Sequence, residues 1–434
     1  MLNMKKNFEQ MGLNSQQPII GVILIAILAW AGYALGQTKA SLPMYLLAGV
    51  LLGYILTRSR FGFAGGVKRI YVRGEGSLTK ALILMLAVTM FLALGIQWFA
   101  ASNGAVTAMV AKEGEAIIPG TQNVAFTNIA TILGGFIFGV GMMLAGGCAS
   151  GTLADFGEGE GHAIIALPFF VLGAAPGHWL RYVIDESSVG KVGFQVYLPD
   201  YVGFVGAVVI TLVLLGVLYW ITRRYEDKRK QAGTYADPKS DYEVFEQPLK
   251  DAQAFKWTSF ETYHKFFIER WSFVTGAILL SVVSIFILIT TQKAWGVTSA
   301  FTVLDVYVLQ KLGMTFESPA FESILEKVNA GLLQDGGTIR NIGLVFGSLI
   351  AFLLAGRFKF NFRFKGKDGV YFAVGGLMMG VGSRMAKGCN IGALYSAITN
   401  FSLSGWVFLI ALTLGGIVGL KAFAGKVCII PNKK

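Results

Sequence analysis

The sequence is poor in charged residues, in cysteine and in histidine. Only 14% of its 434 residues are charged and 54% are hydrophobic, with a mean hydropathy of +0.60, whereas soluble domains usually carry about 25% charged residues. Three cysteines and three histidines are too few and too scattered for a disulfide framework or a zinc-binding pattern. The sequence has no nucleotide-binding, haem-attachment or metal-ligand motif. We therefore expect no cofactor, and no transport powered by ATP within this chain.

Acidic residues are the scarcer of the two charged classes. The chain has 25 acidic and 37 basic residues, a net charge of +12. The basic residues gather beside apolar runs, in 58–73, after 222, in 357–368 and near the C-terminus. Such clusters orient membrane proteins with the positive loops in the cytoplasm. They predict contact with membrane lipid and no nucleic-acid partner, and they place both termini in the cytoplasm.

Apolar runs long enough to cross a bilayer, about 17–25 residues for a helix, recur along the chain. We predict an all-α integral membrane protein with about ten transmembrane helices. The first membrane half covers 1–222, a polar cytoplasmic linker covers 223–271, and the second half with a C-terminal tail covers 272–434. The candidate spans are residues 19–36, 43–57, 80–100, 128–146, 163–180, 201–222, 272–290, 341–356, 370–386 and 404–424.

One glycine-rich motif occurs twice. "GVGMMLAGGCASGTL" at 139–153 and "GVGSRMAKGCNIGAL" at 380–394 agree at eight of fifteen positions, and Cys148 aligns with Cys389. The match indicates an internal duplication, with repeats of about 43–183 and 272–424. The first motif follows a span that runs inward and the second a span that runs outward, so the repeats are predicted to be inverted. Many transporters are built from inverted repeats and bind substrate near the membrane midplane, beside broken helices.

The residues around each cysteine predict a short helix that dips toward the midplane and begins at the thiol. The N-terminus of a helix attracts anions and favours the reactive thiolate. Alternatively, the cysteines and glycines only pack helices together, although the repeat at matched positions favours a substrate path. The predicted path residues are Gly147, Cys148, Ser150, Gly388, Cys389 and Asn390.

Arg384 and Lys387 lie just before the second motif cysteine. Cations inside a membrane are costly and usually functional, so both residues are candidates for drawing an anion toward Cys389. Snorkelling to the interface is an equal alternative. The acidic residues Asp155 to Glu160 and the neighbouring His162 are interpreted as a solvated connection rather than a metal site.

The paired motifs "LGGFIFGVGMMLAGGCASG" and "GVGSRMAKGCNIGALYSAITNFSLSGW" resemble those of the YeeE/YedE family of sulfur-transport membrane proteins, and "RFGFAGGVKR" does so more loosely. The resemblance implies an hourglass-like inverted-repeat fold in a bacterial inner membrane. It also implies uptake of thiosulfate or a related small sulfur-containing anion past Cys148 and Cys389, with a cytosolic sulfur-carrier protein as a possible partner. Family members often have a third cysteine where this chain has Gly62.

Three alternatives remain open at this point. Family members linked to selenium share the motifs, so a selenium compound is a rival substrate. A membrane thiol enzyme that transfers sulfur covalently is a rival function, although neither cysteine has an obvious acid–base partner in the sequence. The third alternative is a structural membrane subunit that anchors a cytosolic partner through residues 223–271.

Overall fold

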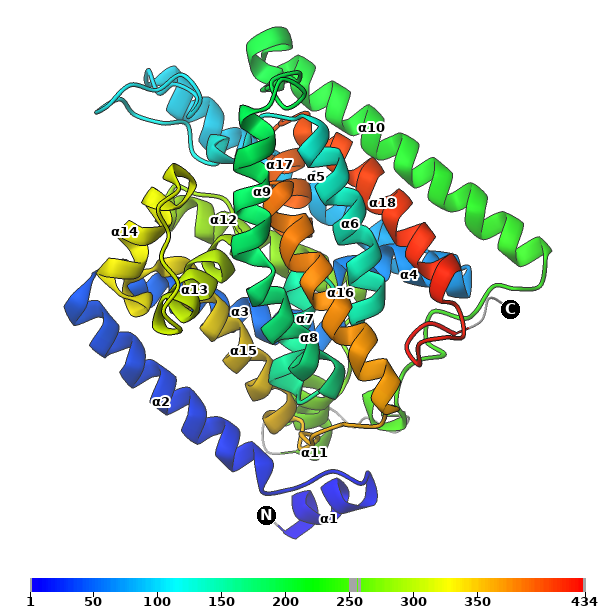
Figure 1. The fold of residues 1–434 in the computed structure, drawn as a ribbon. Helices are drawn as coiled ribbons and strands as arrows, with labels where there is room; N and C mark the ends of the chain where they lie inside the picture. Colours follow the sequence, from blue (N-terminus) through cyan, green and yellow to red (C-terminus); the bar gives the residue numbers. More distant parts are fainter. Residues whose placement is uncertain (1, 250–255, 257–258, 432–434) are drawn as a thin grey trace.

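A computed structural model of the chain describes residues 2–249, 256 and 259–431 (Figure 1). Parts of the predicted linker 223–271 and the last three residues of the predicted segment 272–434 lie outside this range. Within the described residues, helices are accompanied by four isolated β-bridges and no strand. The predicted all-α fold is confirmed.

The helices before the linker follow the predicted spans closely, and the structure adds short helices between them. They are α1 (Leu2–Gln10), α2 (Gln17–Thr38), α3 (Leu42–Ser59), α4 (Phe63–Arg73), α5 (Ser77–Ser102), α6 (Ile129–Ala145), α7 (Ala149–Glu158), α8 (Gly161–Leu172), α9 (Ala174–Glu186) and α10 (Leu198–Gln231). Helix α10 continues past the predicted span end at 222, because the charged residues that follow lie on further helical turns rather than in a loop.

The linker and the second half contain the remaining helices. They are α11 (Phe260–Tyr263), α12 (Phe273–Thr291), α13 (Thr298–Lys311), α14 (Glu322–Ala330), α15 (Gly336–Leu354), α16 (Gly366–Met385), the π-helical turn η6 (Asn390–Tyr395), α17 (Ser396–Thr399) and α18 (Ser404–Phe423). Within the described residues, nine helical stretches are long and apolar enough to cross a membrane. The remaining predicted span, 370–386, forms α16. It falls outside the nine because charged residues and glycines lower its hydropathy.

The two helices that lead into the cysteine motifs, α6 and α16, pack directly against each other. A Cβ atom added at Gly134 would lie 2.7 Å from the carbonyl oxygen of Gly382, and one at Gly141 would lie 2.7 Å from that of Gly375. Small residues permit this close backbone approach between membrane helices. Since contacts advance along α6 as they go back along α16, the two helices are antiparallel. The motifs therefore run in opposite directions, as an inverted duplication requires.

The main contacts between the two halves occur in symmetric pairs. Helix α3 packs on α15, and α12 packs on α5; likewise α6 packs on α18, and α16 packs on α8. These pairs correspond if α3 is matched with α12, α5 with α15, α6 with α16 and α8 with α18. The matched helices occur in the same order in the chain, which is the arrangement that two copies of one unit produce.

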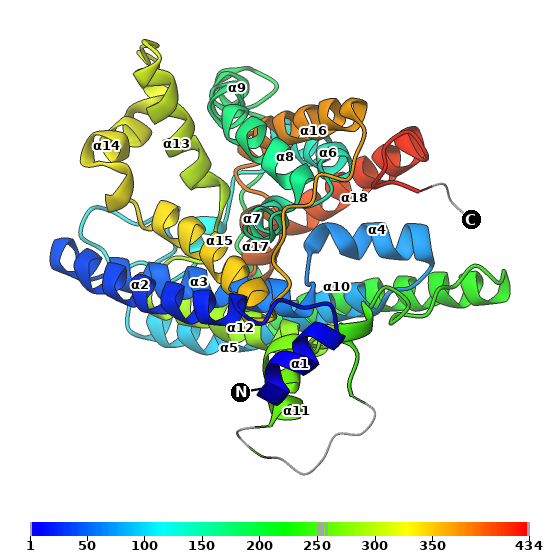
Figure 2. The ribbon, with the colours of Figure 1, turned by 90° about the horizontal axis from the view of Figure 1, so that it is seen from below.

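The short helices that follow the cysteines lie in the middle of the molecule. Figure 2 shows α7 and α17 at the centre, with α6, α8, α9 and α16 on one side of them and α3, α5 and α12 on the other. Helix α7 packs on α8, α15 and α3, and α17 packs on α5 and α18. Both short helices are therefore enclosed by membrane helices from the two halves.

Helices α2 and α10 lie at the periphery, on opposite sides of the bundle (Figure 1). Their outward side chains are apolar and exposed, for example Trp30 at 70% and Val205 at 80%. Apolar surface on this scale suits a lipid environment. The chain is thus a multi-pass membrane protein. Near its two ends, α1 contacts α11 of the linker and Pro431 lies beside a cavity bordered by linker residues.

Candidate functional site

Each motif cysteine is the residue at which a short helix begins. Cys148 precedes α7 with φ −83° and ψ −177°, and Cys389 precedes η6 and α17 with φ −99° and ψ −164°. The carbonyl of Cys148 accepts a hydrogen bond from Thr152 N at 2.7 Å, and that of Cys389 accepts one from Ala393 N at 2.8 Å. The predicted short helices, starting at the thiols, are therefore present in both copies.

The two short helices meet in the interior. Helix α7 contacts η6, and both cysteines are 0% exposed. The thiol of Cys148 lies 3.5 Å from the hydroxyl of Ser150. The amide nitrogen of Asn390 lies 3.9 Å from the sulfur of Met142, while its buried amide oxygen has no partner. Within the described residues, no hydrogen bond joins an ionisable side chain to either thiol.

A cavity of about 600 Å³ opens beside Cys148, and we call it the linker-side cavity. Gly147 and Cys148 form part of its wall, and linker residues border its mouth. Its charged lining is balanced, with Arg60, Lys68, Arg69, Arg73 and Arg270 against Asp155, Glu158, Asp241, Glu243 and Glu246.

A second cavity of about 710 Å³ lies beside the other motif, and we call it the basic cavity. Gly388 and Gly392, on either side of Cys389, are in its wall. Its charged lining is unequal, with more basic than acidic residues. The basic residues are Lys39, Lys293, Lys327, Arg340, Arg384 and Lys387, and the acidic residues are Glu326 and Asp335. An excess of one charge in a concave site concentrates ions of the opposite sign. The basic cavity therefore favours anions. Cys148 lies in the wall of the linker-side cavity, and Gly388 and Gly392, near Cys389, lie in the wall of the basic cavity.

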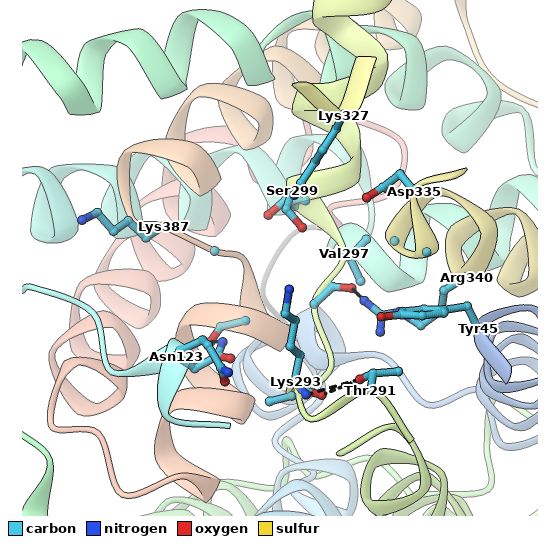
Figure 3. A pocket seen from close by; sticks show the side chains of 18 of the residues that line it. Tyr45, Asn123, Thr291, Lys293, Val297, Ser299, Lys327, Asp335, Arg340 and Lys387 are labelled. Atoms are coloured by element: carbon cyan, nitrogen blue, oxygen red, sulfur yellow. Dashed lines mark hydrogen bonds between the residues drawn. The ribbon is translucent and has the colours of Figure 1, made fainter. Parts of the chain in front are cut away.

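Of the two cations predicted near Cys389, Arg384 is better placed than Lys387. The side chain of Lys387 points away from the centre of the cavity (Figure 3), is 44% exposed and lies 3.7 Å from a carboxylate oxygen of Asp185. Arg384 has no carboxylate partner among the described residues; its guanidinium lies 3.5 Å from Nδ1 of His178 and its Nε atom is buried without a partner. A guanidinium without a carboxylate partner is more available to an anion than an ammonium group that already lies near a carboxylate.

Arg340 is a site residue that the sequence analysis missed. It is 6% exposed, lies near the start of α15, and donates a hydrogen bond to the carbonyl of Gly296. In Figure 3 its guanidinium and the amine of Lys293 face the same open volume, with Asn123 on the far side. The structure extends the spanning helix back to Gly336, so Arg340 lies within the span, where a cation is costly, and not before it as the predicted run 341–356 implied.

Gly62 lies at the start of α4 and lines the linker-side cavity. Its φ of −136° and ψ of 129° are open to any residue, and an added Cβ would have no atom within 4 Å. Nothing in the backbone or the packing therefore requires glycine here. The position has room for a side chain that would face the cavity.

The prediction of a solvated connection at 155–162 is wrong for Glu158, whereas the side chain of Asp155 is 28% exposed and lines the linker-side cavity. Asp155 and Glu158 lie in α7, and Glu158 is 2% exposed. Glu158 accepts a hydrogen bond from Arg60 at 2.8 Å, and Asp155 lies 3.2 Å from His162. The prediction failed for Glu158 because the last turn of α7 places its carboxylate against Arg60 in the protein interior.

The linker also enters the site. Asp241 forms ion pairs with Arg69 and Arg270, and Glu246 forms ion pairs with Arg60, Arg270 and Arg357. Burial raises the pKa of Glu246, but Arg60 and Arg357 outweigh this effect and hold its pKa below the usual value. Both carboxylates are thus held in the charged form at the mouth of the linker-side cavity.

Comparison with known proteins assigns the family. The family described as sulphur transport matches residues 58–418. The chain is 26% identical over 385 residues to the thiosulfate transporter TsuA of Escherichia coli, covering 85% of this chain and 91% of the relative. It is also 26% identical over 381 residues to TsuA of Spirochaeta thermophila, covering 85% and 95%. It is 28% identical over 177 residues to the probable transporter YedE of Escherichia coli, covering 41% and 43%. The chain belongs to the sulphur transport family of membrane proteins.

Proposed function

We propose that the chain carries thiosulfate or a closely related sulfur-containing anion across the membrane, from the basic cavity to the linker-side cavity. One observation carries the proposal: two buried cysteines each start a short helix, one in the wall of the linker-side cavity and the other beside residues that line the basic cavity. Family membership and relatives named as thiosulfate transporters support the same substrate class.

The anion enters the basic cavity, where Arg384, Arg340 and Lys293 compensate its negative charge. Desolvating an anion is expensive unless charged or hydrogen-bonding groups replace its water. Arg384 lies on the last turn of α16, the helix that leads into the turn at Cys389. The anion therefore passes from Arg384 to Cys389 and afterwards to Cys148.

The thiols give weak S–H contacts to the anion while the backbone N–H groups at the helix starts face it. Weak contacts suit transport, because an ion that is held tightly does not leave. No covalent step is needed. Since both thiols are fully buried, passage requires the side chains around them to move.

The proposed orientation places the linker and both termini in the cytoplasm of a bacterial cell, with the basic cavity facing outward. The basic clusters at 58–73 and 357–368 lie on the linker side, where the positive-inside rule places them in the cytoplasm. A cytosolic sulfur-carrier protein is the proposed acceptor of the released anion, since the linker-side cavity opens toward that compartment.

The test is uptake of radiolabelled thiosulfate into liposomes that contain the purified protein. The proposal predicts uptake above that of protein-free liposomes, and competition by unlabelled thiosulfate stronger than by sulfate, sulfite or selenium oxyanions. Absence of uptake, or strongest competition by a selenium compound, would overturn the substrate assignment.

A further inference from the structure

Three arginines surround the carboxylate of one linker residue, Glu246, at the mouth of the linker-side cavity. Glu246 is 3% exposed in its side chain, and its carboxylate lies 3.5 Å from Arg60 and 4.0 Å from Arg270, with Arg357 as a direct partner. The three arginines come from three separate segments: the end of α3, the end of the linker, and the connection between α15 and α16. A single carboxylate thus has a shell of converging guanidiniums, the geometry that proteins use for small oxyanions.

The arginines are not fully used by the protein's own groups. Arg60 and Arg270 line the cavity. Arg270 is 4% exposed in its side chain, and its Nε atom is buried without a hydrogen-bond partner. A buried guanidinium with a free donor is costly, so Arg270 has hydrogen-bonding capacity that its ion pairs with Asp241 and Glu246 do not use.

Arg60 also links this shell to the cysteine helix. One of its terminal nitrogens donates to Glu158, on the last turn of α7, while the other approaches Glu246. Helix α7 begins at Cys148. Arg60 therefore connects the arginine shell around Glu246 to the helix that begins at Cys148, and it is held by both Glu158 and Glu246.

We propose that Arg60, Arg270 and Arg357 form an exit site for a small divalent oxyanion, and that Glu246 occupies this site as a built-in competitor until the anion displaces it. The inference rests on the proposed function for the direction of movement, but the binding site itself does not depend on transport. Glu246 lies on a short turn, Val244–Glu246, in the linker, so it can leave the site without moving a membrane helix.

The test uses Gly62→Cys as a reporter, because this position faces the same cavity and has room for a side chain. The introduced cysteine is labelled in the full chain with iodoacetamide, which is neutral, or with iodoacetate, which is negative, and the labelled peptide is quantified by mass spectrometry. Adding Glu246→Gln is expected to raise the iodoacetate rate at least threefold relative to the iodoacetamide rate. The matched control is Glu243→Gln, which lines the same cavity but forms no ion pair within the described residues; it should leave the ratio unchanged.

Sulfate, an inert divalent oxyanion, then probes the site directly. Sulfate should protect the reporter from iodoacetamide at a concentration at least tenfold lower in the Glu246→Gln variant than in the parent. Equal sulfate protection in the parent and in the Glu246→Gln variant would overturn the proposed exit site. So would a ratio of iodoacetate to iodoacetamide rates that Glu246→Gln leaves unchanged. A Glu246→Gln protein that has unfolded would react faster with both reagents alike and would lose sulfate protection. Failure of the proposed function is separate: it appears as absent thiosulfate uptake by the parent chain, whatever the labelling shows.

Discussion

Cys148 and Cys389 occupy the same structural position in two oppositely directed copies of one motif. Each is fully buried, has an extended backbone and starts a short helix. Cys148 lies in the wall of the linker-side cavity, whereas the glycines that flank Cys389 line the basic cavity. The two copies of the motif therefore contribute to the walls of two different cavities.

Arg384 should matter more than Lys387 for capturing the anion. The change Arg384→Gln removes an unpaired guanidinium, and a hydrogen bond to a charged group contributes about 1.5–3 kcal/mol. We expect the KM for uptake to rise about tenfold or more, since about 1.4 kcal/mol corresponds to tenfold. Lys387→Gln, the matched control, should change the KM less than threefold because Lys387 already pairs with Asp185. Equal effects in uptake assays at one ionic strength would contradict this ranking.

The glycines of α6 and α16 should be needed for packing rather than for the substrate path. A Cβ added at Gly382 would lie 2.6 Å from the carbonyl oxygen of Gly134, so Gly382→Ala should destabilise the protein by about 1–3 kcal/mol through overpacking. Gly95→Ala, in α5, is the control: nothing lies within 4 Å of the added atom, and alanine favours helix. Thermal unfolding in detergent measures the stability of both variants relative to the parent protein. A Gly382→Ala protein as stable as the parent would show that this crossing is looser than described.

The position of the missing third thiol should be open to reagents. Gly62 lines the linker-side cavity with no atom near an added Cβ, whereas Cys148 is completely covered. A cysteine introduced by Gly62→Cys should react with iodoacetamide at least tenfold faster than Cys148 in the same protein. Peptide mass spectrometry measures both rates at once, so Cys148 is an internal control. Similar rates would mean that the cavity does not reach this point.

Much of this arrangement could be predicted from the sequence. The repeated motif located both cysteines, the short helices that follow them and their opposite directions, because glycine spacing and apolar runs are local signals. The positions of Arg340 and Glu246 could not be predicted. Each depends on packing between segments far apart in the chain: Glu246 meets Arg60, 186 residues away, and Arg340 donates to Gly296, 44 residues away. The linker in particular was interpreted as a polar connection, since composition does not reveal which partner a carboxylate finds.

Docking of the linker should depend on pH through Glu246. Burial raises the pKa of this carboxyl, but Arg60 and Arg357 outweigh burial and hold the pKa below the ordinary value of 4.5. A group with a lowered pKa stabilises the folded state above its unfolded value and loses that contribution as the pH falls through the lowered one. Hydrogen exchange of residues 241–246, corrected for its intrinsic pH dependence, should therefore be constant near neutrality and rise below pH 4.5. The Glu246→Gln variant should show raised exchange already at neutral pH; protection equal to that of the parent would contradict the role of this ion pair.

The most direct test of the account is thiosulfate uptake by single-cysteine variants in liposomes. Cys148→Ala and Cys389→Ala should each reduce initial uptake at least tenfold while the protein stays folded, because each removes one of the two thiols of the proposed path. Cys428→Ala is the matched control, since Cys428 is exposed and lies outside both motifs, and it should transport like the parent. Undiminished uptake by both motif variants would contradict the cysteine path.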